Sequence, residues 1–230
     1  MLLDTRGKLF LTLSALFCTA LVVGDIIGGK LTGVPFFGEV RFLSVGFITF
    51  PITFLLTDLL NEFYGKKAAR TVTFVGLGMA VFTLIILTVA VAVPWHPETL
   101  EPEWGGLTPV PYDAVFSSGR RILVASMVAY VFAQLLDIAV FHKLKSITHG
   151  KLLWLRATGS TVVSQLLDTI VIQSLVWNEN LDVPKLINLI LTSWIGKILI
   201  ALLLTPLIYA GHAFVERVLK IEPQKPDEAT

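Results

Sequence analysis

The sequence predicts an all-α integral membrane protein with six transmembrane helices. Three observations lead to this fold class: 54% of the 230 residues are hydrophobic, only 15% are charged, and the mean hydropathy is +0.77. Soluble proteins carry about 25% charged residues. The apolar residues are gathered into runs of about 20, the length that an α-helix needs to cross a bilayer. Residues 1–220 are therefore expected to form one six-helix membrane domain, followed by a polar tail at residues 221–230.

Six apolar runs, separated by polar or helix-breaking residues, give the expected spans. They lie near residues 9–29, 43–63, 71–93, 121–142, 157–177 and 186–212. Basic residues precede the first run, as in a secretory signal, but the run continues to about Ile27 and so exceeds a signal's short apolar region. All six spans are expected to be helical, because an open sheet cannot pair its backbone groups in lipid.

The longest connection, residues 94–119, contains five prolines, which argue against a helix through it. Trp95 and Trp104 in this connection are typical of the lipid headgroup level. An interfacial linker is the expected structure, and a lid over an outward opening is the alternative. The C-terminal tail is polar and contains prolines, so it is expected to be disordered.

Lys and Arg are shared unevenly between the two sides of the membrane, and this sets the expected orientation. The side reached by the connections after the first, third and fifth spans carries Lys30, Arg41, Arg120, Arg121 and Lys185. The other side carries Arg6, Lys8, Lys66, Lys67, Arg70, Lys143, Lys145, Lys151, Arg156, Arg217, Lys220 and Lys225. The excess predicts that both termini are cytoplasmic.

Polar residues inside the spans are the candidates for function, because a charge at the bilayer centre costs about 2.5–3.5 kcal/mol even on insertion scales. These residues are Asp25, Asp58, Asn61, Glu62, Gln134, Asp137, Gln165, Asp168 and Lys197. Helical spacing predicts which of them share a face. One stripe on the fourth span is formed by Ser126, Tyr130, Gln134 and Asp137. A second stripe, on the fifth span, is formed by Ser160, Ser164 and Asp168, with Gln165 at its edge.

These stripes suggest a central cavity for a flat polar solute. The alternative is that the polar groups hydrogen-bond one another and hold the helices together. Lys197 lies too deep in the sixth span to reach water, so it needs a carboxylate, and Asp168 is the partner of matching depth. That pair is either a structural ion pair or a switch that a solute or proton breaks. Glu62, beside Lys66 and Lys67, also has a purely interfacial explanation.

Other chemistries find no support in the sequence. The single cysteine, Cys18, allows no disulfide within the chain. There is no HExxH pattern and no Walker A sequence, so no metal and no cofactor are expected, and an ATPase would be a separate chain.

Four segments carry a resemblance to a known family: "FPITFLLTDLLNEFYGKKAARTVTFVG" (50–76), "RRILVASMVAYVFAQLLDIAVFHKLK" (120–145), "LRATGSTVVSQLLDTIVIQS" (155–174) and "GKILIALLLTPLIY" (196–209). Together they resemble the queuosine precursor transporter family, also called the YhhQ-like or VUT vitamin-uptake family. The resemblance implies a six-helix importer in the bacterial inner membrane, similar in fold to the substrate-binding subunits of energy-coupling-factor importers. It implies 7-cyano-7-deazaguanine or 7-aminomethyl-7-deazaguanine as substrate, salvaged for tRNA modification. The matching positions implied as substrate-binding are Asp58, Arg121, Gln134, Asp137, Ser160, Asp168 and Lys197.

The chemistry of a deazaguanine agrees with these residues. Its adjacent N1–H and 2-amino donors suit a carboxylate, for which Asp168 is the first choice and Asp137 the second. Its carbonyl requires a donor such as Lys197 or Gln134. Its flat ring favours an aromatic neighbour, for which the candidates are Tyr130, Trp194 and Phe54.

Three functional classes remain open at this level. A secondary carrier, working without an ATPase partner and without nucleic acid, is the principal expectation. The alternatives are the binding subunit of an ATP-driven vitamin or nucleobase importer, and an intramembrane enzyme with Asp137 and Asp168 as acid and base. A homodimer is also expected to be possible, because Gly76, Gly78 and Ala80 allow close helix packing.

Overall fold

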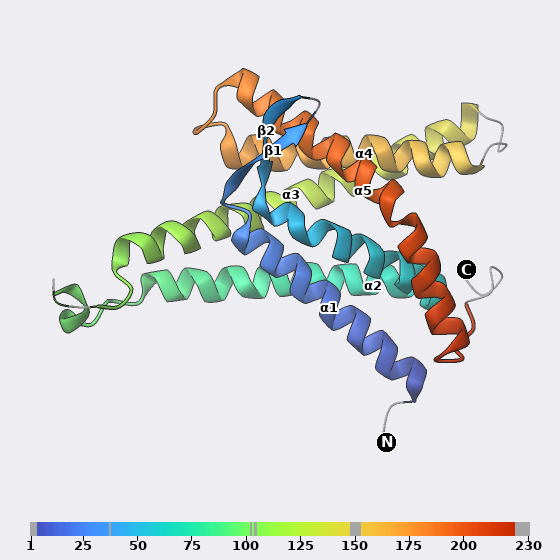
Figure 1. The fold of residues 1–230 in the computed structure, drawn as a ribbon, viewed down its shortest axis with the longest axis horizontal. Helices are drawn as coiled ribbons and strands as arrows, with labels where there is room; N and C mark the ends of the chain where they lie inside the picture. The colour runs from blue at the N-terminus through green and yellow to red at the C-terminus, as the bar shows by residue number, and fades with distance from the viewer. Residues whose placement is uncertain (1–3, 37, 102, 104, 148–152, 224–230) are drawn as a thin grey trace.

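The structure, a computed structural model, describes residues 4–36, 38–101, 103, 105–147 and 153–223. Helices dominate it, and a short two-stranded sheet follows the first helix (Figure 1). In chain order the elements are α1 (Thr5–Ile27), β1 (Leu31–Phe36), β2 (Glu39–Ser44), η1 (Val45–Thr49), α2 (Phe50–Ala92), η2 (Pro97–Leu100), α3 (Pro109–Ile147), α4 (Leu153–Trp177) and α5 (Val183–Arg217).

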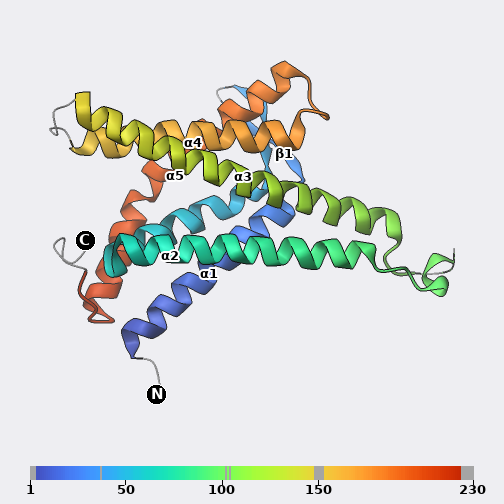
Figure 2. The same ribbon diagram turned by 180° about the vertical axis from the view of Figure 1, so that it is seen from behind.

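Helix α2 consists of two helices that fold back on each other at Gly65. This residue has φ 77° and ψ 170°, a conformation that is essentially restricted to glycine. Figures 1 and 2 show the two parts of α2 running in opposite directions from this point. They correspond to the second and third predicted spans, which the sequence places on either side of residues 64–70.

Within the residues that the structure describes, five helical segments are long and apolar enough to cross a membrane. They cover Thr5–Ile27, Val45–Gly65, Lys67–Ala92, Pro109–Ala133 and Val183–Arg217. The described apolar part of α4 is shorter and covers Val162–Trp177. The prediction of an all-α membrane protein is thus confirmed in its coarse form, as a multi-pass helical protein, and the span at residues 157–177 stays a prediction.

Helix α1 packs against the turn of α2 through contacts that tie the N-terminus to the bundle. Asp4 caps α1 by accepting a hydrogen bond from the Gly7 amide at 2.8 Å. Arg6 donates to the Phe63 carbonyl oxygen at 2.6 Å. Gly76 lies against the Phe17 ring, where a Cβ would come within 3.0 Å of Cε1. This small residue therefore serves packing within the chain.

The β1–β2 hairpin was not predicted. Its strands pair in antiparallel register from Leu31↔Ser44 to Phe36↔Glu39, with Gly38 at φ 84° in the turn. The prediction missed it because the segment is short and lies between two strongly apolar runs. A two-stranded sheet leaves the outer edge of each strand unpaired, so the hairpin is compatible with a connection between spans and not with exposure to lipid. The second span consequently begins with η1 at Val45, after the strand.

The prediction that prolines keep residues 94–119 free of helix is wrong for its second half. Helix α3 begins at Pro109, and η2 begins at Pro97. Proline is compatible with the first turn of a helix, because the N–H groups of that turn have no acceptor within the helix and proline's fixed φ is close to the helical value. Trp95 packs edge-on against Tyr112 at 5.3 Å between ring centroids, whereas Trp104 lies outside the described residues.

Helix α5 begins where Asp182 accepts a hydrogen bond from the Lys185 amide at 3.2 Å. The Lys185 ammonium also donates a hydrogen bond to the Asp182 carboxylate. These hydrogen bonds lower the pKa of the Asp182 carboxyl, so the capping side chain stays ionised. Pro206 lies inside α5, and Figure 1 shows this helix changing direction before its C-terminal part.

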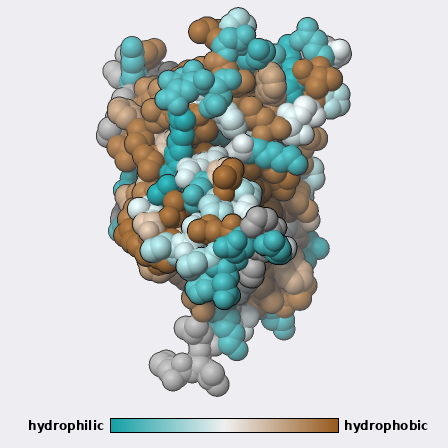
Figure 3. Space-filling model, turned by 90° about the vertical axis from the view of Figure 1, so that its left-hand side faces the viewer, coloured by the Kyte–Doolittle hydropathy of each residue, from teal (hydrophilic) through white to brown (hydrophobic). Residues whose placement is uncertain are grey.

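The apolar surface of the helices is typical of a membrane protein. Large apolar side chains are exposed along the helices, among them Phe82 at 59%, Leu202 at 66% and Leu203 at 76%. Figure 3 views the molecule from the end that carries the α2–α3 connection and shows polar residues across this end with apolar residues on its flanks.

Candidate functional site

An ion pair lies inside the bundle between α4 and α5. Lys197 Nζ is 2.8 Å from Asp168 Oδ2 and donates to Gln165 Oε1 at 3.2 Å. The side chains of Lys197 and Asp168 are only 14% and 18% exposed. The structure thus contains the pairing that matching depth predicts. Two buried opposite charges with one further acceptor form a polar centre that is otherwise surrounded by apolar helices.

An aromatic wall covers one side of this ion pair. Lys197 Nζ lies 5.6 Å from the centroid of the Phe50 ring, within the range of a cation–π contact. Phe50 is stacked between Phe47 and Phe54, at centroid distances of 5.6 Å and 5.9 Å. Phe47 reaches α5 because Gly196 has no side chain: a Cβ there would lie 3.0 Å from the Phe47 ring. Sequence reasoning named Phe54 as an aromatic neighbour and missed Phe50.

A second carboxyl group, that of Asp25, approaches the same region from α1. Ser126 on α3 donates a hydrogen bond to Asp25 Oδ2 at 2.8 Å. Asp25 is also close enough to Asp168 for their charges to repel each other. Polar side chains of α1, α3, α4 and α5 therefore lie in this region.

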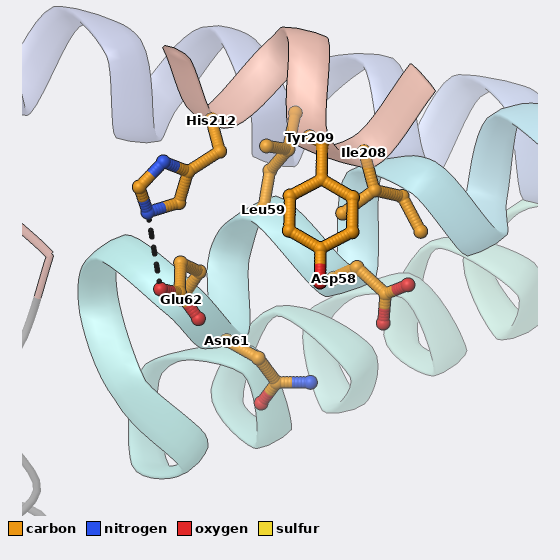
Figure 4. A pocket seen from close by; sticks show the side chains of 7 residues that line it. All are labelled: Asp58, Leu59, Asn61, Glu62, Ile208, Tyr209 and His212. Atoms are coloured by element: carbon orange, nitrogen blue, oxygen red, sulfur yellow. Dashed lines mark ion pairs between the residues drawn. The ribbon is translucent and has the colours of Figure 1, made fainter. Parts of the chain in front are cut away.

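A separate pocket of about 460 Å³ lies between α2 and α5, near the fold-back of α2 and both described chain ends (Figure 4). In this pocket His212 Nε2 is 3.2 Å from Glu62 Oε1, and Nδ1 is 3.6 Å from a carboxylate oxygen of Glu216. The predicted site residues Asp58, Asn61 and Glu62 all line it. They do not share the ion-pair centre, so the predicted site divides into two groups.

Arg121 lies at the opposite end of the molecule from this pocket. Its guanidinium pairs with Glu179 at 3.0 Å and donates to the Leu175 carbonyl oxygen at 3.1 Å. With Ser117, Trp177 and other residues it lines a cavity of about 330 Å³. Arg121 therefore connects α3 to the α4–α5 turn and does not reach Asp168 through these contacts.

The remaining predicted site residues have structural contacts or lie outside the described side chains. Trp194 donates its indole N–H to the Val162 carbonyl oxygen at 3.2 Å, which joins α5 to α4. Tyr130 meets Phe74 edge-on at 6.5 Å between centroids. The side chains of the other three residues lie outside the described part of the structure: Gln134, Asp137 and Ser160.

The structure also shows buried polar residues that the sequence analysis did not select. Thr169, Gln173, Thr192 and Ser193 are between 2% and 8% exposed. Gln173 lies four residues after Thr169 and eight after Gln165, on the same face of α4. This spacing was the available signal, and it was missed because hydroxyl and amide side chains without a charge are common in membrane helices. Within the described part of the chain, no group of three or more His, Cys, Asp or Glu side chains is placed to hold a metal ion.

Comparison with known proteins gives one family and several relatives. The family described as "Putative vitamin uptake transporter" matches residues 44–211, which run from the end of β2 to near the end of α5. A "Probable queuosine precursor transporter" of Bacillus subtilis (strain 168) is 28% identical over 173 residues, covering 75% of this chain and 72% of that protein.

Two further relatives match over a smaller share of both chains. A protein with the same description from Haemophilus influenzae is 31% identical over 154 residues, covering 66% of this chain and 60% of that protein. The "Queuosine precursor transporter" of Escherichia coli (strain K12) is 28% identical over 125 residues, covering 54% and 51%. The chain therefore spans between half and two thirds of the length of these two relatives. No solved structure matches it.

Proposed function

This chain belongs to the vitamin uptake transporter family, and on that premise we propose that it imports queuosine precursors, the 7-deazaguanine bases, across the bacterial inner membrane. Its relatives described as queuosine precursor transporters support the substrate class. The observation that carries the proposal is the buried pair of Asp168 and Lys197. Charged residues inside a membrane are energetically costly, and they mark sites that a solute or ion uses.

The edge of a 7-deazaguanine can replace the contact between these two residues. That edge presents two adjacent donors, the 2-amino group and N1–H, followed by the carbonyl oxygen. Asp168 accepts the two donors in a bidentate, charge-assisted pair, and Lys197 donates to the carbonyl. Both charges remain satisfied after the solute has entered, so the exchange avoids leaving a buried charge unpaired. Gln165, already bound to Lys197, orients the ammonium.

The flat face of the base stacks on Phe50. The Phe50 ring faces Lys197. A base that binds between these two residues contacts the same face of the ring. Stacking and edge-to-face contacts of aromatic rings contribute about 0.5–1.5 kcal/mol beyond their buried area. This wall favours planar solutes over flexible ones of equal polarity.

The two groups of polar residues serve successive stages of transport. The ion-pair centre binds the base in the membrane, and the pocket with Asp58, Asn61 and Glu62 receives it on the cytoplasmic side before release. In this proposal α4 is the fifth of six spans, both termini are cytoplasmic, and the carrier works without an ATPase by rocking its helices around the central site.

The test is uptake of labelled 7-cyano- and 7-aminomethyl-7-deazaguanine by the purified protein in liposomes, for the wild type and Asp168→Asn. The expected result is uptake by the protein alone that is lost in the variant. Binding without uptake would refute the stand-alone carrier and indicate the binding subunit of an ATP-driven importer. Absence of both binding and uptake would refute the substrate class.

A further inference from the structure

A set of buried polar side chains between α4 and α5 has hydrogen-bonding capacity that the folded chain does not use. We call Thr169, Gln173, Thr192 and Ser193 the polar seam. Gln173 Nε2 donates to Ser193 Oγ at 3.4 Å, near the limit for a hydrogen bond. The other end of the amide, Gln173 Oε1, and the Thr192 hydroxyl are fully buried and have no hydrogen-bond partner among the described residues.

These groups are buried enough for their unused capacity to matter. Gln173 is 8% exposed, and Thr192 is 2% exposed. A buried acceptor without a donor costs about 1–3 kcal/mol, so such atoms call for a ligand or bound water. Thr169 differs, because its hydroxyl already donates to the Gln165 carbonyl oxygen at 2.8 Å. The free capacity is therefore concentrated at Gln173 and Thr192.

The seam continues the ion-pair centre along the same two helices. Ser193 precedes Lys197 by one helical turn on α5, about 6 Å along the axis. Gln173 follows Asp168 by five residues on α4, about 7.5 Å along the axis. This separation is comparable to the long dimension of a bicyclic base. One solute can therefore contact Asp168 and Lys197 with one edge and reach the seam with a substituent on its five-membered ring.

The unpaired acceptors of the seam favour a hydrogen-bond-donating substituent. In the ion-pair centre the Asp168 carboxylate and the Lys197 ammonium already compensate each other, and Asp25 accepts a hydrogen bond from Ser126. An alkylammonium group adds a positive charge and supplies the donors that Gln173 Oε1 and the Thr192 hydroxyl oxygen lack. A nitrile adds no charge and offers only an acceptor.

We propose that the polar seam is a second subsite, which binds a hydrogen-bond-donating amine substituent of the transported base, with Gln173 and Thr192 as its acceptors. The assignment rests on the proposed function, and it deepens that function by selecting the 7-aminomethyl over the 7-cyano base. Gln173 thereby becomes a specificity-determining residue, distinct from the pair that holds the base itself.

Competition in liposomes tests this subsite. Unlabelled 7-aminomethyl- and 7-cyano-7-deazaguanine compete against labelled base in the wild type, Gln173→Leu, Thr192→Val and the control Thr205→Val. Thr205 is an exposed hydroxyl on the same helix and donates to the Ala201 carbonyl oxygen. The wild type and the control are expected to prefer the amine about tenfold, the effect of one charge-assisted hydrogen bond. Gln173→Leu should abolish this preference by weakening competition by the amine alone, and Thr192→Val should reduce it.

Each other outcome overturns a defined part of the argument. Equal competition by both bases in the wild type, or preference for the nitrile, refutes the subsite and indicates that water fills the seam. Equal weakening of both bases by Gln173→Leu refutes the specific role and indicates a packing role. If Gln173→Leu does not fold, Thr192→Val decides, because it removes only a hydroxyl. Absence of any uptake by the wild type refutes the proposed function, and the subsite with it.

Discussion

Replacement of Lys197 by Met tests whether the central ion pair is a coupled unit. Met has a similar length and remains apolar, so the change removes the charge with little change in volume. It takes away the partner of Asp168 at 2.8 Å, the donor to Gln165 Oε1 at 3.2 Å and the cation over the Phe50 ring. Asp168, only 18% exposed, is then left as a buried carboxyl group without its counter-charge.

The expected loss follows from this burial. Removal of one partner of a buried ion pair costs about 3–5 kcal/mol, because the remaining charge is uncompensated. For a chain of this size each kcal/mol lowers the melting temperature by about 2–4 °C, so the apparent Tm should fall by about 6–20 °C. Asp168→Asn leaves Lys197 in the same position and should cost a similar amount. The double variant should be more stable than the sum of the two losses predicts, because neither charge remains.

The chain offers its own reporter for this measurement. Cys18 is the single cysteine and is partly buried on α1, so a thiol-reactive dye reports its exposure as the detergent-solubilised protein unfolds. Uptake is measured in parallel and should be lost in both single variants. Strictly additive losses in the double variant, or uptake by Lys197→Met at the wild-type rate, would refute the coupled, solute-replaceable pair.

Three further predictions concern other parts of the molecule. Phe50→Leu should raise the KM for the base about tenfold through loss of the stacking face, whereas Phe50→Tyr should keep it near the wild-type value; equal KM values would exclude stacking. Gly65→Ala should destabilise the protein by about 1–3 kcal/mol, because φ 77° and ψ 170° strain any residue with a Cβ; an unchanged Tm would contradict a fixed fold-back. In a Cys18→Ala background, a membrane-impermeant thiol reagent added to intact cells should label Asn180→Cys, and should label Lys220→Cys only after permeabilisation; the reverse pattern would invert the proposed orientation.

The central pair shows how far sequence reasoning reaches in a membrane protein. Lys197 is an ammonium in the interior of an apolar run, and only a carboxylate at similar depth can compensate it, so spacing along the two helices was sufficient to name Asp168. Asp58, Asn61 and Glu62 were predicted only as candidate binding residues, without an assigned partner, and the structure places them in a separate pocket. Depth along a helix is readable from sequence, whereas the direction in which the helix presents a side chain depends on its neighbours.

Phe50 and Gln173 illustrate what was missed. Phe50 lies where the second span begins, and its contact with Lys197 depends on the close approach of η1 to Gly196 on a distant part of the chain. Gln173 is uncharged and lies on a regular polar face, so nothing in its local sequence separates it from residues that join helices. The unused hydrogen-bonding capacity of its Oε1 atom becomes visible only when both helices are in place.

Sequence reasoning was sufficient for the membrane class, for five of the helical spans and for the pairing of Lys197 with Asp168, because hydrophobicity and the cost of a buried charge act locally along the chain. The tertiary structure decided the fold-back at Gly65, the hairpin between the first two spans, the start of α3 at Pro109 and the division of the polar residues into two groups. These features depend on which surfaces meet: a glycine conformation, paired strands and a proline in a first turn are stable only within the packing and hydrogen bonds that surround them.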